Sequence, residues 1–295
     1  MVALLKSLWR HRSLIGEFIV RDLKARYVGS SMGFFWSVIF PIMNLFVYMF
    51  VFRLVLKVRW EDSAESRTAL VMLAGILVWA AFAETVSRTT NCLVENSNLI
   101  QKVVFPSEIL PPYLVSSSIV NMAIGLPVLL LGVVFLDRSE SLGIAFQPDQ
   151  LSVCLVLLPV LALLQAVFTA GLGYLFSTLN LFLRDTYHVV GVLVTVWMFA
   201  TPIFYPAFMV DKELYREQFP ETFEARNMEV TMRDFGWLLD INPMHWLIQC
   251  YRDIILNQSW PDWFLMGKFA VVALVLFSLG SWFFMSQKRT FPDLL

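Results

Sequence analysis

The sequence predicts an all-α polytopic membrane protein with six transmembrane helices. Hydrophobic residues make up 58% of the 295 residues and charged residues only 15%, whereas soluble domains carry about 25% charged residues. Long apolar runs also recur along the whole chain, and a helix crosses a bilayer with about 20 apolar residues. We therefore expect one membrane domain over residues 1–295, with an N-terminal amphipathic interface helix and re-entrant outer gate helices between spans five and six.

Residues 1–30 predict the amphipathic helix. Its bases lie on one side, and its apolar residues fall near the other: Leu4, Leu8, Ile15, Phe18 and Ile19. Such a helix lies in the headgroup layer and is attracted to membrane lipid. Two interpretations remain open, namely a simple anchor that sets orientation and a helix that also packs on a partner.

Six apolar runs follow, and each is long enough to span. They lie at residues 33–56, 69–87, 112–136, 151–183, 189–205 and 263–285. The fourth run is long enough to tilt or to project into water. Spans one to five thus occupy residues 33–205, and an outer loop and gate occupy residues 206–262 before span six.

The charges orient these spans. Residues 1–30 hold six bases and two acids, whereas residues 206–262 hold ten acids and five bases. Basic segments stay on the cytoplasmic side of a membrane. We therefore expect both termini in the cytoplasm, and the segment 206–262 outside.

The connection between spans two and three then faces the cytoplasm. Asn98 is placed to cap a short helix, and its apolar residues share one face: Leu99, Ile100, Val103 and Val104. The prolines after Phe105 stop that helix, and Pro111 and Pro112 begin the next one. This pattern predicts a stiff helix that receives a push from another protein, or alternatively a plain interfacial turn.

The outer segment has two parts. The part up to Phe235 is charged, and the part over 236–258 is apolar but too short to span. The second part predicts a helix that begins at Asn242–Pro243 and re-enters the outer leaflet as a gate. A helix lying on the outer surface is the alternative, because irregular backbone within a membrane needs protein or a wet cavity around it.

Aromatic and charged residues suggest two further features. Trp36, Phe40 and Tyr48 belong to an aromatic-rich first span, and a ladder of such rings offers sugar rings a surface on which to slide, although most of these rings are expected to face lipid or protein. Glu84 and Arg88 are four residues apart and are predicted to pair on one helix face.

The chain shows no motif of a catalytic centre. It has no GxxxxGK[ST] phosphate loop, and Cys92, Cys154 and Cys250 are too scattered for a metal cluster. We expect no metal, no directly bound cofactor, no nucleic-acid partner and no enzymatic activity of its own. A membrane scaffold of this kind needs a separate subunit to supply the energy for its activity.

Four stretches then carry a family resemblance. They are, in order, RDLKARYVGSSMGFFWSVIFPIMNLFVYMFVF, VVFPSEILPPYLVSSSIVNM, LFLRDTYHVVGVLVTVWMFATPIFYP and INPMHWLIQCYRDIIL. Together they resemble the permease subunits of ABC exporters for O-antigen, capsular polysaccharide and teichoic acid. The resemblance implies a homodimer with two ATPase subunits that bind ATP and Mg. It also implies export of a lipid-linked polymer, usually on undecaprenyl diphosphate, across the bacterial inner membrane.

The resemblance also implies roles for particular residues. The ATPase would be met by Glu95, Asn98, Leu99, Ile100, Lys102, Phe105 and Pro106, and at the second cytoplasmic turn by Arg184 and Asp185. The lipid diphosphate would be met by Arg21, Lys24, Arg26 and Tyr27. Asn242, Pro243 and Trp246 would belong to the outer gate. The acidic insert 211–234 departs from the compact family pattern.

Three other functions are weighed against polymer export. An ABC permease for a drug or small lipid would have a narrow, dry interface instead of an aromatic channel. A membrane-embedded glycosyltransferase would need acids in an outer loop, and residues 211–234 supply some. An ion-coupled carrier is disfavoured, because few charges lie within the spans and no inverted repeat is visible.

Overall fold

The computed structural model describes residues 2–27, 33–57, 65–102, 105–136, 153–220, 222 and 234–295. Helices dominate the described chain, and no strand occurs in it. The first half contains α1 (Val2–Arg10), α2 (Arg12–Tyr27), η1 (Gly33–Phe35), α3 (Trp36–Tyr48), η2 (Met49–Val55), α4 (Glu65–Glu95), α5 (Ser97–Lys102), η3 (Ser107–Ile109) and α6 (Leu110–Leu136).

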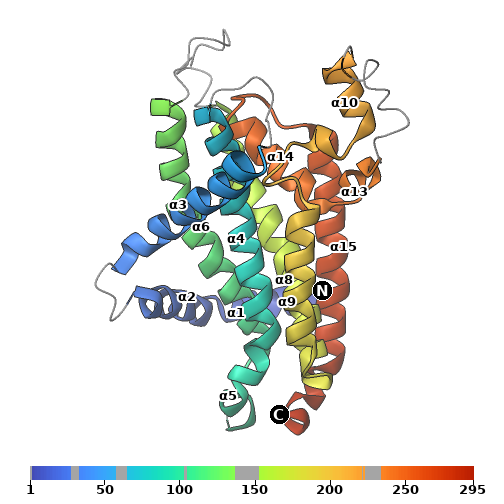
Figure 1. The fold of residues 1–295 in the computed structure, drawn as a ribbon. Coiled ribbons are helices and arrows are strands. Elements are labelled where there is room, and N and C mark those ends of the chain that lie inside the picture. The colour runs from blue at the N-terminus through green and yellow to red at the C-terminus, as the bar shows by residue number, and fades with distance from the viewer. Residues whose placement is uncertain are drawn as a thin grey trace.

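The second half is also helical. It contains η5 (Leu155–Leu157), α8 (Leu158–Phe182), α9 (Thr186–Ala200), η6 (Ala207–Met209), α10 (Lys212–Gln218), α13 (Gly236–Asp240), α14 (Pro243–Ile255), α15 (Trp263–Gln287), η7 (Lys288–Thr290) and α16 (Phe291–Leu294). Figure 1 shows α4, α8, α9 and α15 running along one long axis, with α2 lying across it. The short helix α5 and the C-terminus lie at one end, and α10, α13 and α14 lie at the other.

Four helical segments are long and apolar enough to cross a membrane. They are Arg67–Glu95, Ser107–Val133, Leu155–Phe182 and Trp263–Leu294, and they contain or overlap the second, third, fourth and sixth predicted runs. The first and fifth runs form shorter apolar helices, Val38–Phe52 and Thr186–Ala200. The prediction of an all-helical membrane protein is confirmed at this level.

Local sequence explains several helix boundaries. Pro111 and Pro112 lie in the first turn of α6 as predicted, because the N–H groups of that turn have no partner within the helix. The fifth apolar helix ends at Ala200, and the backbone of the following Thr201 is extended. Pro202 follows, and a proline disfavours helical backbone in the residue before it.

The centre of the bundle is α4. In its most apolar window 72% of the residues are buried, against 28–39% in the other three long helices. It packs on α6, α8, α9, α14 and α3, and its buried face carries Met72, Trp79 and Phe82. The long helices α6 and α8 therefore pack on the same central element, and α15 is held against the bundle by α8 and α14.

Two glycines let α8 and α15 approach closely. A Cβ atom built on Gly280 would lie 2.1 Å from the carbonyl oxygen of Gly171, and one on Gly171 would lie 2.5 Å from the backbone nitrogen of Phe277. No side chain fits at either position. Small residues at such crossings allow the backbone contact that stabilises helix pairs in membranes.

A second buried cluster fastens the N-terminal helices to the bundle. Leu4 and Phe18 are buried in it, and Leu8, Ile15 and Ile19 pack against its edge. The apolar side predicted for residues 1–30 is thus the side that packs inward. The helix itself is divided into α1 and α2 by a turn at His11.

Candidate functional site

The short helix α5 begins two residues earlier than the predicted cap allows. The backbone N–H groups of Leu99 and Ile100 donate to the carbonyl oxygen of Asn96, at 3.0 and 3.2 Å. The side chain of Asn96 donates to the carbonyl oxygen of Cys92 at 2.8 Å. Asn96 therefore closes α4 and opens α5. The prediction that Asn98 caps this helix is wrong, since Asn98 lies inside it and is exposed.

The faces of this segment agree with the predicted pattern as far as they are described. Ile100 is buried and Leu99 is half-buried, whereas Glu95 and Asn98 are exposed. The side chain of Lys102, together with Val103 and Val104, lies outside the described residues. Helix α5 is thus fixed to the second buried cluster by its apolar side and presents its polar side outward.

The proline-rich connection after α5 is braced by a buried acid, Glu108. Ser7 Oγ donates to Glu108 Oε1 at 2.6 Å, and Lys288 Nζ pairs with Glu108 Oε2 at 2.5 Å. The hydroxyl of Tyr174 donates to the Glu108 carbonyl oxygen at 2.8 Å. Pro106 precedes the 3-10 turn that holds Glu108. Both chain ends and α8 therefore meet at this turn.

Sequence reasoning did not single out Glu108. The sequence context could have marked it, because Glu108 is an acid flanked by Pro106, Pro111 and Pro112 at the start of a long apolar run. A buried acid in such a place needs partners. Its partners come from residues 7, 174 and 288, and no local pattern points to them.

The second predicted coupling turn lies between α8 and α9. Arg184 and Asp185 are exposed there. Asn180 connects this turn to the end of α4, because its side chain donates to Asn91 Oδ1 at 3.3 Å and accepts from the Tyr187 backbone N–H at 3.2 Å. The two turns predicted to meet an ATPase are thus linked by one asparagine.

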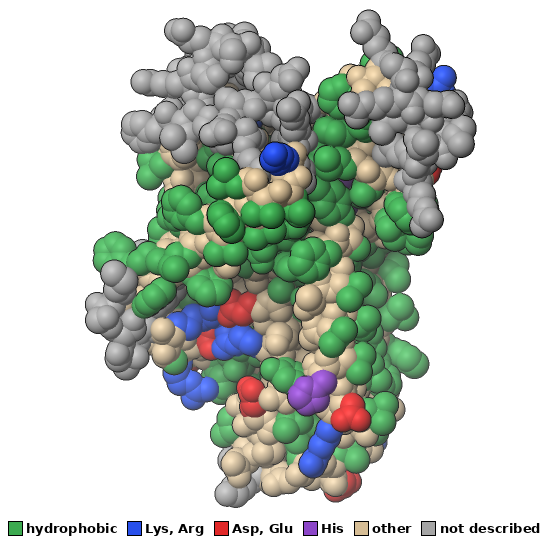
Figure 2. Space-filling model, viewed as in Figure 1, with side chains coloured by type: hydrophobic (Ala, Val, Ile, Leu, Met, Phe, Trp, Pro, Cys, Tyr) green, Lys and Arg blue, Asp and Glu red, His purple; other side chains and the backbone are tan. Residues whose placement is uncertain are grey.

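A cluster of charges joins α2 to the bundle. Asp22 accepts hydrogen bonds from both terminal nitrogens of Arg88, from Arg26 Nε at 3.2 Å and from Ser117 Oγ at 2.5 Å. Glu84 pairs with Arg26 at 2.6 Å and with Arg88 at 3.3 Å. The predicted Glu84–Arg88 pair is confirmed, and Asp22 is its unforeseen centre. Figure 2 shows basic and acidic side chains gathered below a hydrophobic band.

The electrostatics of this cluster hold Asp22 ionised. Burial alone would raise its pKa, but hydrogen bonds from Arg88 and Ser117 and the charges of Arg88 and Arg26 lower the pKa to about 2. A half-buried carboxylate that is paired with several partners in this way resists separation from them. The cluster therefore fixes the position of α2 against α4 and α6.

The four predicted interface residues differ in their freedom to meet a ligand. Arg26 is half-buried and held by Asp22 and Glu84. Arg21 and Lys24 are exposed, and the Arg21 guanidinium lies 4.2 Å from the ring centre of Phe18. The side chain of Tyr27 lies outside the described residues.

A cavity of about 500 Å³ lies beside the charge cluster. Its lining includes Trp36 and Phe40 of α3, Arg26 and Glu84 of the cluster, and Asn121 of α6. Two predicted channel aromatics thus share one cavity with charged and amide groups. The third, Tyr48, packs elsewhere, with its ring centre 4.0 Å from that of Phe204.

At the opposite end, Asn242 begins α14 as predicted. Its side-chain oxygen accepts from the backbone N–H groups of Met244 and His245, at 3.1 and 3.3 Å, and from Trp197 Nε1 at 2.8 Å. Its amide nitrogen donates to Thr201 Oγ1 at 2.9 Å, while Pro243 is the first residue of the helix. Asn242 therefore ties the start of α14 to the end of α9.

Trp246 is buried in the first turns of α14. Its Nε1 donates to the carbonyl oxygen of Leu239 at 3.1 Å, and the Lys268 ammonium lies 5.3 Å from its ring centre. The predicted gate residues Asn242, Pro243 and Trp246 thus form one packed unit with α13 and α15.

A comparison with known protein families decides the class of the chain. The sequence model of the ABC-2 type transporter family matches residues 14–214, which include most of α2, the charge cluster and both predicted coupling turns. The chain belongs to this family.

Three curated relatives resemble this ABC-2 type chain over nearly its whole length. A Myxococcus xanthus protein named O-antigen export system permease protein RfbA is 29% identical over 293 residues, which cover 99% of each chain. Two Klebsiella pneumoniae proteins of the same name are 25% and 24% identical over 275 residues, or 93% of this chain and 92% of theirs.

Proposed function

We propose that this protein is the transmembrane permease subunit of an ABC exporter for an O-antigen polysaccharide. The observation that carries the proposal is the end-to-end likeness to the Myxococcus xanthus permease, together with membership of the ABC-2 type family. The protein works as a homodimer in the bacterial inner membrane. Two separate ATPase subunits bind ATP and Mg and supply the energy.

The membrane arrangement has six membrane segments, made of the four long apolar helices and the two shorter ones in α3–η2 and α9. Helix α2 lies across the bundle axis (Figure 1) and rests at the cytoplasmic surface as the interface helix. Both termini are cytoplasmic. Helices α13 and α14 re-enter the membrane from outside and form the gate, which Asn242 ties to α9.

The ATPase meets the polar side of α5 and the exposed Arg184–Asp185 turn. A push on α5 passes into α4, because Asn96 lies between the two helices and hydrogen-bonds to both. Asn180 shares the movement with the α8–α9 turn. The Glu108 turn, including Phe105 and Pro106, makes the connection between α5 and α6 rigid. The movement of α5 is therefore transmitted to α6.

The polymer enters beside the interface helix. Exposed Arg21 and Lys24 attract the diphosphate of an undecaprenyl-linked chain, because cationic side chains bind phosphate by charge-assisted hydrogen bonds. Arg26 serves mainly to position α2, since Asp22 and Glu84 already hold it. The first sugars lie against Trp36 and Phe40 in the adjoining cavity, and Tyr48 continues the aromatic path.

The test is to purify the permease with the ATPase encoded beside it and to measure polymer transport into vesicles. Replacement of the exposed Asn98 and Gln101 by alanine should preserve folding, because it leaves the Asn96 junction and the buried Ile100 intact, but should uncouple ATP hydrolysis from transport. The control replaces Thr290, an exposed residue near the C-terminus, by alanine. If no ATPase associates with the wild-type permease, or if transport proceeds without ATP, the proposal is wrong.

The same experiment separates the two rival functions. A permease for a drug or small lipid would transport those compounds in the complex but leave the lipid-linked polymer behind. A membrane glycosyltransferase would extend a glycan without any ATPase subunit. Neither result is expected from a chain whose full-length relatives are named as O-antigen permeases.

A further inference from the structure

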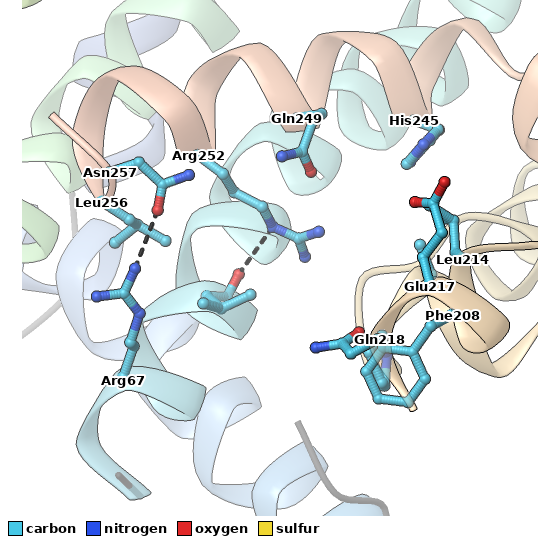
Figure 3. Close-up of a pocket in the computed structure, with 13 residues that line it drawn as sticks. Arg67, Phe208, Leu214, Glu217, Gln218, His245, Gln249, Arg252, Leu256 and Asn257 are labelled. Atoms are coloured by element: carbon cyan, nitrogen blue, oxygen red, sulfur yellow. Dashed lines mark hydrogen bonds between the residues drawn. The ribbon is translucent and has the colours of Figure 1, made fainter. Parts of the chain in front are cut away.

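A second cavity, of about 460 Å³, lies at the end of the molecule opposite α5. Figure 3 shows it between α14, the first turns of α4 and the η6–α10 segment. Its volume falls in the range of roughly 300–1,000 Å³ that is typical of small-molecule sites. None of the coupling, interface or gate residues predicted from the sequence lines it, although the gate helix α14 forms part of one wall.

One wall of this outer cavity carries two guanidinium groups, those of Arg67 and Arg252 (Figure 3). Arg252 is only 7% exposed, and it donates to the carbonyl oxygens of Val71 and Ile203 at 3.4 Å each. Both distances are long for hydrogen bonds from a charged donor. Burial lowers the pKa of Arg252 to about 10, although Asp253 acts in the other direction. An anion in the cavity would therefore stabilise a cation that burial destabilises.

The other guanidinium stands nearer to solvent. Arg67 Nη2 donates to Asn257 Oδ1 at 3.0 Å, a bond that orients the group along the cavity wall (Figure 3). A guanidinium presents its N–H groups in a fixed planar pattern that matches the oxygens of a carboxylate or phosphate. The two arginines come from α4 and α14, so the cationic wall exists only in the folded protein.

The facing wall carries neutral and acidic hydrogen-bonding groups. Figure 3 places Glu217, Gln218 and Phe208 across the cavity from the arginines. Gln249 and His245 of α14 also line it. The Nδ1 atom of His245 is buried and has no hydrogen-bond partner within the described part of the chain. Burial, helped by the charge of Arg252, lowers the pKa of His245 to about 4, so the ring is neutral at neutral pH.

We propose that this cavity binds an acidic saccharide unit, a sugar that carries a carboxylate or a phosphate. The anionic group lies against Arg67 and Arg252. The sugar hydroxyls meet Gln249, Glu217 and His245, which supply both donors and acceptors. The site takes this unit from the glycan after it has crossed the membrane, and in that respect the inference rests on the proposed function.

A zwitterionic lipid headgroup shares part of this chemistry, because its phosphate suits the arginines and its ammonium suits Glu217. The amides and the unpartnered imidazole favour the saccharide, since several separate hydroxyls would satisfy groups that a headgroup leaves unused. A buried polar atom without a partner is costly, and His245 Nδ1 is such an atom.

The test measures binding to the purified permease–ATPase complex in phosphatidylcholine nanodiscs by ligand-observed NMR. The probes are trigalacturonate, neutral maltotriose and glycerophosphoethanolamine. Trigalacturonate should bind about tenfold or more tighter than maltotriose, as expected for charge-assisted hydrogen bonds. Arg67→Gln should weaken trigalacturonate binding by about tenfold, whereas Arg67→Lys should retain most of it. His245→Ala should weaken binding of both sugars.

The matched control is Arg289→Gln, which removes an exposed arginine at the other end of the molecule and should leave binding unchanged. Equal affinity for the two sugars, no binding of trigalacturonate, or binding that neither Arg67→Gln nor His245→Ala alters would overturn the inference. Binding of glycerophosphoethanolamine alone, with the same sensitivity to Arg67→Gln, would assign the cavity to lipid instead.

Polymer transport by the same complex is measured separately. Normal transport without trigalacturonate binding would overturn this inference and leave the proposed function standing. A permease that binds trigalacturonate through Arg67 but associates with no ATPase would support the site and contradict the proposed function.

Discussion

The charge cluster around Asp22 and the outer cavity around Arg252 both place arginine in partly or fully buried surroundings, but they do so in different ways. Arg26 and Arg88 share Asp22 and Glu84, so two bases face two acids at short distances. Arg67 and Arg252 instead donate to amide and carbonyl oxygens. A group of charges that is closed on itself holds a structure together, whereas a pair of cations that lines a cavity can receive an anion.

The largest expected effect is the loss of stability when the matched cluster is broken. Asp22→Ala leaves the half-buried Arg88 without its central partner. The expected loss is therefore at the lower end of the about 3–5 kcal/mol that removal of one member of a fully buried pair costs. We expect a decrease of about 3 kcal/mol in the free energy of unfolding, measured by denaturant titration in detergent. Glu17→Ala, an exposed acid on the same helix, is the control and should change it by less than about 0.5 kcal/mol. Equal effects of the two variants would mean that Asp22 does not hold α2.

A smaller effect should appear on mild acidification, and it comes from the outer cavity. The pKa of His245 is lowered from 6.5 to about 4 in the folded chain. Between these values the unfolded chain binds a proton that the folded chain does not, so stability falls as the pH decreases from about 6.5 to 4. We expect the free energy of unfolding to decrease by on the order of 2 kcal/mol. The measurement is the midpoint of denaturant unfolding at several pH values across that range.

His245→Ala should flatten the pH dependence between 6.5 and 4. The decline below pH 4 should persist in this variant, because the pKa of Asp22 is lowered from 3.8 to about 2 and its stabilising contribution is lost only as the pH falls through that lower range. A decline between pH 6.5 and 4 that is unchanged in His245→Ala would assign it to another group.

The smallest effect compares two asparagines that both resemble helix caps in the sequence. Asn242 accepts the backbone N–H groups of α14, so Asn242→Ala should cost about 1–2 kcal/mol. Asn98 lies inside α5 and is exposed, so Asn98→Ala should change stability by less than about 0.5 kcal/mol. Thermal unfolding of both variants in one detergent measures the difference. A larger loss for Asn98→Ala would restore it as the cap.

Features that depend on neighbouring residues were predictable. The apolar runs indicated an all-helical membrane protein, because a bilayer requires about 20 apolar residues per crossing helix. The starts of α6 at Pro111 and Pro112 and of α14 at Asn242 follow from the special backbone chemistry of those residues. Glu84 and Arg88 pair because they are one helical turn apart.

Asn98 marks the limit of such local reasoning. A cap was predicted there from residue type alone, but the preceding helix α4 continues to Glu95 and Asn96 closes it. The position of the cap therefore depended on where a neighbouring helix ends. That end is set by packing of α4 in the bundle, which residue type does not report.

The sequence by itself determined the class of the chain, the approximate segments that enter the membrane and the residues that begin two of its helices, because these properties come from composition and from contacts within a few residues. Only the tertiary structure decided the partners of Asp22, which include Ser117, 95 residues away. It also decided the bracing of Glu108 by Ser7 and Lys288 and the meeting of Arg67 with Arg252 around one cavity. The physical reason is that a buried charge is stabilised by the groups that the fold brings within about 3 Å. The separation of two residues along the chain does not show whether the fold brings them together.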